Sequence, residues 1–119
     1  MRCVSCALIV LLCGCSTTSR GRVVTSDTTL DQIAWSDAEL AKPIAARRLR
    51  ATAETSCHLI RLAGAEKPHI HKDHDLVVVL LSGTARLHLG ERVSDVRPGD
   101  VMEIPRGTVH WAENIGADA

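Results

Sequence analysis

The chain of 119 residues contains no phenylalanine and no tyrosine, and its only large aromatic side chains are Trp35 and Trp111. A pocket with so few rings is a poor platform for stacking on sugars or flat heterocycles. The chain also lacks an excess of charge, since 14 basic residues balance 14 acidic ones. This balance leaves no electrostatic basis for a nucleic-acid partner. We interpret the one short basic run, Arg47, Arg48 and Arg50, as the solvated face of a strand.

Cysteine is scarce outside the N-terminal segment, because four of the five cysteines lie within residues 1–15 and only Cys57 lies beyond. Residues 1–15 begin with one positive charge, continue as an apolar run and end in Leu-Cys-Gly-Cys. This is the form of a secretory signal and is too short to span a membrane. The closing tetrapeptide resembles a bacterial lipobox, which would make Cys15 the lipidated first residue of the mature chain. The alternative is an ordinary cleavable signal.

Three consecutive regions follow from this interpretation. Residues 1–15 are a lipoprotein signal peptide, residues 16–31 are a flexible tether rich in serine and threonine, and residues 32–119 are one domain. Lipid on Cys15 would leave no pair of cysteines for a disulfide within the chain, and we expect Cys57 to be a small apolar strand residue. Membrane attachment would then depend on lipid alone. Ser16 in place of aspartate is typical of outer-membrane lipoproteins that face the periplasm of the bacterial cell envelope.

Hydrophobic patterning predicts an all-β domain. A continuous apolar run predicts a buried central strand over residues 76–81, and alternation is clearest over residues 84–89, where Arg86 and His88 would face outward. A short helical or irregular segment over residues 30–40 would be anchored by Trp35. The remaining strands are expected over residues 46–53, 57–62, 101–104 and 108–112.

Three histidines form the candidate metal site. His69 and His71 are two residues apart, so on a strand their side chains leave the same face. His110 follows the turn-forming run of residues 105–107, and residues 98–100 give another turn signal, so the chain can return His110 to the pair. Neutral imidazoles projecting together from rigid strands suit a divalent metal ion.

The frame around His110 is Gly99, Pro105, Gly107 and Asn114, spaced as G-x5-P-x-G-x2-H-x3-N. This spacing resembles the second motif of the cupin superfamily. A partial first motif lies upstream, with Gly64, the His69-x-His71 pair and Gly83, so the resemblance covers roughly residues 56–116. It implies a small β-barrel of the jelly-roll type and a divalent metal ion, Fe, Mn, Zn or Ni, held by His69, His71 and His110.

The resemblance also implies a glutamate ligand that this chain does not have. The family spacing places it at Asp75 or Leu76, and only Asp75 could bind a metal. Two ligand sets therefore stay open: three histidines with Asp75, or three histidines with open positions. We interpret His74 as a surface histidine and His58 as structural.

Three functions are compatible with such a site, and no catalytic residue can be assigned. The first is a lipid-anchored metal-binding protein that holds a small molecule, and the second is a mononuclear metal-dependent dioxygenase or isomerase. The third is a structural domain with a vestigial site. Arg106 could bind an anionic substrate or be merely solvated, whereas Glu103 and Glu113 are expected to face outward. Trp111 should point to the opposite face of its strand from His110, and we expect it to pack in the core or at an interface rather than contact a substrate.

The chain ends five residues after Asn114. We therefore expect a barrel that is incomplete at its C-terminal edge and is completed by the N-terminal segment or by a second copy. A homodimer formed by strand addition is a possible arrangement, because an unpaired strand edge favours association.

Overall fold

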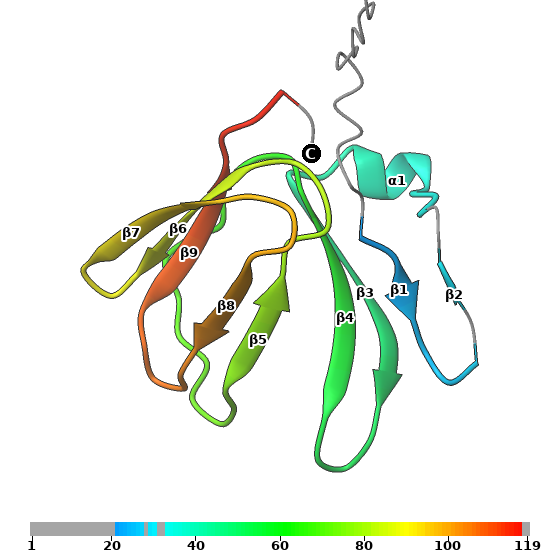
Figure 1. The fold of residues 1–119 in the computed structure, drawn as a ribbon, viewed down its shortest axis with the longest axis horizontal. Helices are drawn as coiled ribbons and strands as arrows, with labels where there is room; N and C mark the ends of the chain where they lie inside the picture. The colour runs from blue at the N-terminus through cyan, green and yellow to red at the C-terminus, as the bar shows by residue number, and fades with distance from the viewer. Residues whose placement is uncertain (1–20, 28, 31–32, 118–119) are drawn as a thin grey trace, which may run out of the picture.

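The computed structural model describes residues 21–27, 29–30 and 33–117 (Figure 1). The predicted signal peptide, the proposed lipidation site Cys15 and the first part of the predicted tether lie outside these residues. Within the described ranges, no helix is long and apolar enough to cross a membrane.

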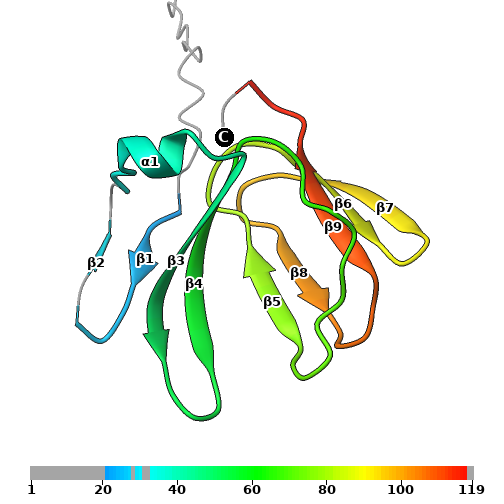
Figure 2. The ribbon, with the colours of Figure 1, turned by 180° about the vertical axis from the view of Figure 1, so that it is seen from behind.

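Short antiparallel strands account for nearly all of the regular structure, as the sequence predicts. They pair as β1 with β2, β3 with β4, β5 with β8, and β7 with β6 with β9. In both ribbon views β5 and β8 lie between the β3–β4 hairpin and the sheet that contains β6 (Figures 1 and 2). The elements are β1 (Val23–Val24), β2 (Thr29–Leu30), α1 (Asp37–Leu40), β3 (Ile44–Ala51), β4 (Ser56–Leu62), β5 (Leu76–Val79), β6 (Ala85–Leu89), β7 (Arg92–Val96), β8 (Val101–Ile104) and β9 (His110–Asn114).

Alternation along β6 separates an inner face from an outer face. Ala85 and Leu87 are buried, and the neighbouring strands add Val96 and Ile104 to the same core. Arg86 lies on the outer face, where its guanidinium donates hydrogen bonds to Asp95 of β7. The strand predicted over residues 84–89 is therefore confirmed, with its inner and outer faces as expected. A second buried group, Ala45 and Leu59, lies in the β3–β4 hairpin.

Strand β5 departs from the prediction of a buried central strand. It pairs with β8 alone, and Val77 and Val79 keep 70% and 49% of their surface exposed. The register places Val79 opposite Val101, which is 65% exposed, so the three valines share one uncovered face. The prediction was wrong because a continuous apolar run shows only that a strand is suited to burial. A second layer of structure must also cover the strand, and this face of β5 remains exposed.

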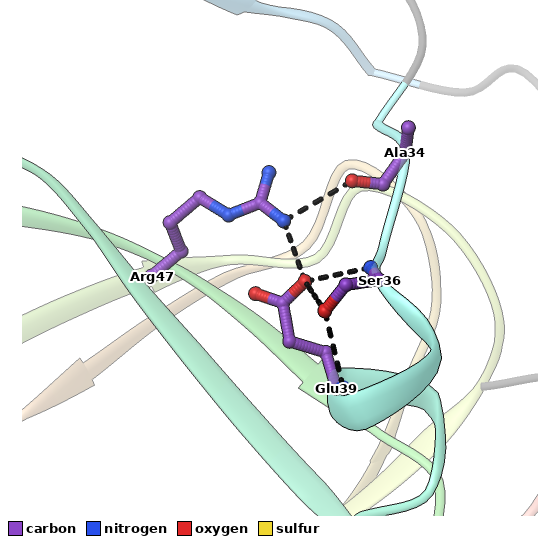
Figure 3. A network of polar contacts seen from close by, with 4 residues as sticks. All are labelled: Ala34, Ser36, Glu39 and Arg47. Carbon is purple, nitrogen blue, oxygen red and sulfur yellow. Dashed lines mark hydrogen bonds and ion pairs between the residues drawn. The ribbon is translucent and has the colours of Figure 1, made fainter.

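The segment before β3 ends in the short helix α1, which has a reciprocal cap. The Ser36 hydroxyl accepts a hydrogen bond from the Glu39 backbone N–H, and the Glu39 carboxylate accepts one from the Ser36 N–H. Arg47 of β3 joins this cap, since its Nη2 donates to Glu39 and to the carbonyl of Ala34 (Figure 3). Its guanidinium also lies 4.9 Å from the centre of the Trp35 ring. Trp35 is thus an anchor of this segment, as predicted.

Arg47 corrects the interpretation of the basic run as a solvated face. Its side chain is half-buried between β3 and α1, whereas Arg48 is exposed. Arg50 is also exposed and donates to the Ser26 hydroxyl. The period-two alternation of β3 is the reason, because it sends Arg47 and Arg48 to opposite faces.

Two strand pairings lie where the sequence predicts none. Val23–Val24 pairs with Thr29–Leu30 within the region assigned to the tether, and β7 follows Gly90 as a partner of β6. Gly90 has φ of 58°, a conformation that allows the tight turn between β6 and β7. The sequence RVSDV of β7 lacks the apolar content that would have identified it.

Candidate metal centre

The site is built on the backbone pairing between β9 and the segment that carries the first two histidines. His69 and His110 exchange both of their backbone hydrogen bonds, at 3.1 and 2.9 Å, so they are directly opposed partners. Cross-strand partners project their side chains from the same face of the sheet. Pairing of two distant segments, rather than local sequence, therefore brings His69 to His110.

A one-residue bulge precedes this pair. Ala65 is opposite Glu113 and His69 is opposite His110, so three residues (66–68) face only two (111–112). Without the extra residue, Pro68 would lie opposite His110, and the side chains of His69 and His110 would point to opposite faces of the sheet. A slip of one residue moves a side chain to the other face of a sheet, so the bulge is what turns His69 inward.

The three imidazoles converge. The ring centres of His69 and His110 are 4.3 Å apart, and His71 lies 5.0 Å from the first ring and 5.1 Å from the second. One ligand nitrogen from each residue lies within 4.8 Å of the others. Metal–nitrogen bonds of about 2.0–2.1 Å in a tetrahedral site place ligand nitrogens about 3.3 Å apart.

Hydrogen bonds fix the tautomer of two of these rings. The Nδ1 atom of His69 is 2.8 Å from the carbonyl oxygen of Lys67, and the Nδ1 atom of His110 is 2.9 Å from that of Thr108. A carbonyl oxygen only accepts, so each Nδ1 carries the proton. When either ring is neutral, its Nε2 is therefore the nitrogen that keeps the lone pair, which is the form in which histidine binds a metal.

The third ring is held through its backbone and is favoured in the neutral form. The Gly107 N–H donates a 2.7 Å hydrogen bond to the His71 carbonyl, which connects the turn before His110 to the segment that carries His71. Burial lowers the pKa of His71, and the neighbouring His110 lowers it further. The donor set thus consists of three imidazoles that converge from a buried His110 and a half-buried pair. It fits a divalent ion of the Zn, Fe, Mn or Ni kind.

Asp75, the candidate fourth ligand, is engaged elsewhere. Its Oδ1 accepts hydrogen bonds from the backbone N–H and Nε of Arg106, and its Oδ2 accepts one from Nη2. Arg106 accordingly lowers the pKa of the Asp75 carboxyl. Asp75 is not part of the group of converging ligand atoms among the described residues. The geometry favours the three-histidine alternative.

The other histidines and acidic residues occupy the positions that their patterns indicate. His74 is exposed, with its ring 4.8 Å from that of His71 at the rim of the site. Trp111 lies on the opposite face of β9 from His110 and stacks on His88 at 4.1 Å. The His88 Nε2 is 3.0 Å from the Glu113 carboxylate on that same outer face. Glu103 and His58 are both exposed, and the Nε2 atom of His58 contacts the Ser56 hydroxyl.

Sequence reasoning missed Glu66. Its backbone N–H donates to the carbonyl of Ala112, and its carboxylate Oε2 accepts a 2.9 Å hydrogen bond from the Ala112 N–H. The half-buried carboxylate also acts on the site electrostatically, since its charge opposes the lowering of the His71 pKa by burial. Its position three residues before His69 matches no ligand spacing, so no sequence pattern indicates that Glu66 lies beside the site.

Comparison with known proteins places this geometry in a family. The sequence profile of the family described as "Cupin domain" matches residues 58–119. An uncharacterized protein of Aquifex aeolicus (strain VF5) is 34% identical over 67 residues, which are 56% of this chain and 55% of that protein. The match thus spans about half the length of that relative.

Two solved structures share the fold. The structure of KdgF from a Halomonas species has a TM-score of 0.62 at 24% identity, with 72% of this chain and 78% of that chain covered. A cupin-2 domain containing protein from Shewanella frigidimarina NCIMB 400 has a TM-score of 0.54 at 21% identity, over 59% and 69% of the two chains. The expectation of a small cupin β-barrel is therefore confirmed. The family match covers more than half of the residues, and the chain belongs to the cupin domain family.

Proposed function

We propose that this protein binds one divalent transition-metal ion through the Nε2 atoms of His69, His71 and His110. The observation that carries the proposal is the convergence of three imidazoles, two of which have Nδ1 occupied by a backbone carbonyl. A histidine cluster formed by chance has no reason to share one tautomer. Backbone acceptors on the second ring nitrogen are the usual support of a metal-binding histidine.

The metal would present open coordination positions to a small molecule. Three protein ligands leave room for water or for a ligand on the ion, and Asp75 is held by Arg106 rather than directed at the site. We propose Fe, Mn, Zn or Ni as the ion and a small polar molecule as the ligand. Bound metal would also stabilise a domain with a small core, because binding to the folded state alone favours folding.

The second candidate function is a metal-dependent enzyme of the dioxygenase or isomerase type. The position of His74 favours it, because an exposed imidazole 4.8 Å from the His71 ring stands where it could transfer protons to a metal-bound molecule. Oxygen consumption or product formation with panels of small thiols, diols and keto acids would support turnover. Ligand-induced thermal stabilisation without turnover would support binding alone.

The proposal extends to the cellular location. Residues 1–15 have the pattern of a lipoprotein signal, so we propose that Cys15 is lipidated and that the protein is held at the outer membrane, facing the periplasm. Cys15→Ser should abolish incorporation of labelled palmitate and release the protein from the membrane fraction. Retention of the label in the variant would contradict the anchor.

Elemental analysis of the purified full-length protein tests the metal site. We expect about one metal ion per chain in the parent, and loss of binding in His71→Ala by more than the roughly 10–100-fold that removal of an outer-shell partner costs. His88→Ala is the matched control, since His88 lies on the outer face of the neighbouring strand. A folded parent that takes up none of the four metals would leave only the structural role with a vestigial site.

A further inference from the structure

The pairing of residues 64–69 with β9 departs from a regular antiparallel ladder at one place. In a regular ladder the hydrogen-bonded pair next to His69 and His110 would be Lys67 and Ala112, with the Lys67 carbonyl accepting from the Ala112 N–H. The bulge moves this pairing by one residue. Glu66 rather than Lys67 donates its backbone N–H to the Ala112 carbonyl, at 2.9 Å.

The bulge leaves the N–H of Ala112 without its usual carbonyl partner. The Glu66 carboxylate supplies the missing acceptor, with Oε2 at 2.9 Å from the Ala112 nitrogen. Beyond the bulge the Asn114 N–H donates to the Gly64 carbonyl at 2.9 Å, while the Gly64 N–H donates to the carbonyl of Pro43. Glu66 therefore contacts Ala112 at two points, once through its backbone and once through its side chain. An N–H in a partly buried strand that loses its acceptor destabilises the pairing.

The carbonyl that the bulge removes from the ladder is the one that orients His69. The Lys67 oxygen accepts the Nδ1 proton of His69 at 2.8 Å, whereas in a regular ladder that oxygen would be directed at the Ala112 N–H. The bulge thus has two consequences for the same ligand: it turns His69 to the inner face and it fixes the Nδ1–H tautomer.

We propose that Glu66 is a positioning residue of the metal site. Its carboxylate replaces a backbone carbonyl at the bulge and thereby leaves the Lys67 carbonyl available to hold His69 with Nε2 directed at the metal. Glu66 acts through His69 and does not itself bind the ion. This inference deepens the proposed function and rests on it for the metal, but the effect on the His69 tautomer exists in the metal-free protein.

Two variants separate the acceptor from the charge. Glu66→Gln keeps an oxygen that accepts from the Ala112 N–H but removes the negative charge, whereas Glu66→Ala removes both. Glu113→Ala is the matched control, because it deletes a carboxylate from the adjacent position of β9 on the outer face. His110 is an internal control in every variant, since its Nδ1 is held by Thr108 and not through the bulge.

The experiment measures the imidazole tautomers of the metal-free, full-length protein by long-range ¹H–¹⁵N correlation at about pH 8, where histidine is neutral. In the parent, in Glu66→Gln and in Glu113→Ala, we expect His69 to carry its proton on Nδ1. In Glu66→Ala we expect the His69 signals to move toward a tautomer mixture while those of His110 stay unchanged. Zn affinity, measured by competition with a chromophoric chelator, should fall about tenfold in Glu66→Ala and recover in Glu66→Gln.

Two results would overturn the proposal. An unchanged His69 tautomer in a folded Glu66→Ala protein would show that the bulge does not depend on the carboxylate. A Glu66→Gln protein as impaired as Glu66→Ala would show that the charge matters and the hydrogen-bond acceptor does not. A parent that binds none of Fe, Mn, Zn and Ni would refute the metal-binding function separately, since the tautomer measurement still decides the role of Glu66.

Discussion

Asp75 and Arg106 are joined by three hydrogen bonds, in which both carboxylate oxygens of Asp75 accept from the backbone and the guanidinium of Arg106 at 2.9–3.2 Å. The pair connects the segment after His71 to the turn before His110. Asp75 lies where the family pattern places a carboxylate ligand, yet here it fastens one side of the site to the other. Its role in this chain is therefore distinguishable by experiment from that of a ligand.

We predict that Asp75→Ala keeps one metal ion per chain. Both side chains of the pair are more than half exposed, so water screens their attraction and its loss should weaken metal affinity by no more than about fivefold. Isothermal titration with Zn measures this affinity. Asp95→Ala is the control, because it removes the carboxylate of another exposed ion pair, between Asp95 of β7 and Arg86 of β6. Loss of the metal in Asp75→Ala alone would identify Asp75 as the fourth ligand.

Gly107→Ala should destabilise the protein and weaken metal binding. Gly107 has φ of 75°, and a Cβ atom there would meet nothing within 4 Å, so the cost is in the backbone conformation and amounts to roughly 1–2 kcal/mol. Asparagine adopts this conformation more readily, so Gly107→Asn should cost less. Urea unfolding measures the cost.

Gly99→Ala provides the matched control for this change. Gly99 also has a positive φ, of 93°, and open space around its Cβ position, but its N–H pairs with Leu80 rather than with His71. We expect a similar loss of unfolding free energy without a change in metal affinity. Equal effects of the two substitutions on metal affinity would contradict a specific link between Gly107 and His71.

The α1 cap should give the stability of the fold a distinctive dependence on acid. Hydrogen bonds from the Ser36 backbone and from Arg47 lower the pKa of Glu39 to about 2, from an ordinary value of 4.5. A carboxyl whose pKa is lower in the folded protein stabilises the fold above its unfolded pKa, and this contribution is lost as the pH falls from about 4.5 toward 2. The melting temperature of the parent should therefore fall more steeply over this range than that of Glu39→Gln. Glu54→Gln, in the exposed turn between β3 and β4, is the control and should show the same pH dependence of the melting temperature as the parent. If the melting temperature of Glu39→Gln and that of the parent fell in parallel with pH, the prediction would be refuted.

A core leucine and a surface valine should differ sharply in their effect on stability. Leu87 is 7% exposed, so Leu87→Ala should lower the unfolding free energy by about 2–4 kcal/mol. Val77 is 70% exposed, so Val77→Ala in a monomer should change it by no more than about 0.5 kcal/mol. Denaturant unfolding at two protein concentrations measures both. A large, concentration-dependent loss in Val77→Ala would instead show that a second copy covers this face, as in the homodimer that the sequence leads us to expect.

The strand that was predicted best from the sequence has one face buried against the core. Apolar and polar side chains alternate over residues 84–89 because β6 lies between β7 and β9, with its inner face on the core and its outer face toward solvent. Residues 76–81 were predicted to be buried from an apolar run that is compatible with burial but does not require it. The short polar strand β7 has no such pattern, because a strand at the edge of the sheet requires little apolar surface.

The amino-acid sequence by itself determined the three histidines, the glycines and proline of the turn between them, and hence the family. Those residues are recognised by type and spacing, which are local properties of the chain. Only the tertiary structure decided which side chains lie beside them. The pairing of β9 with residues 64–69 brings the Glu66 carboxylate to the Ala112 N–H and His69 opposite His110, and Arg106 forms hydrogen bonds with Asp75. The physical reason is that the positions of the ligand side chains depend on the register between segments that are distant in the sequence. One extra residue at a bulge moves the side chains that follow it from one face of the sheet to the other.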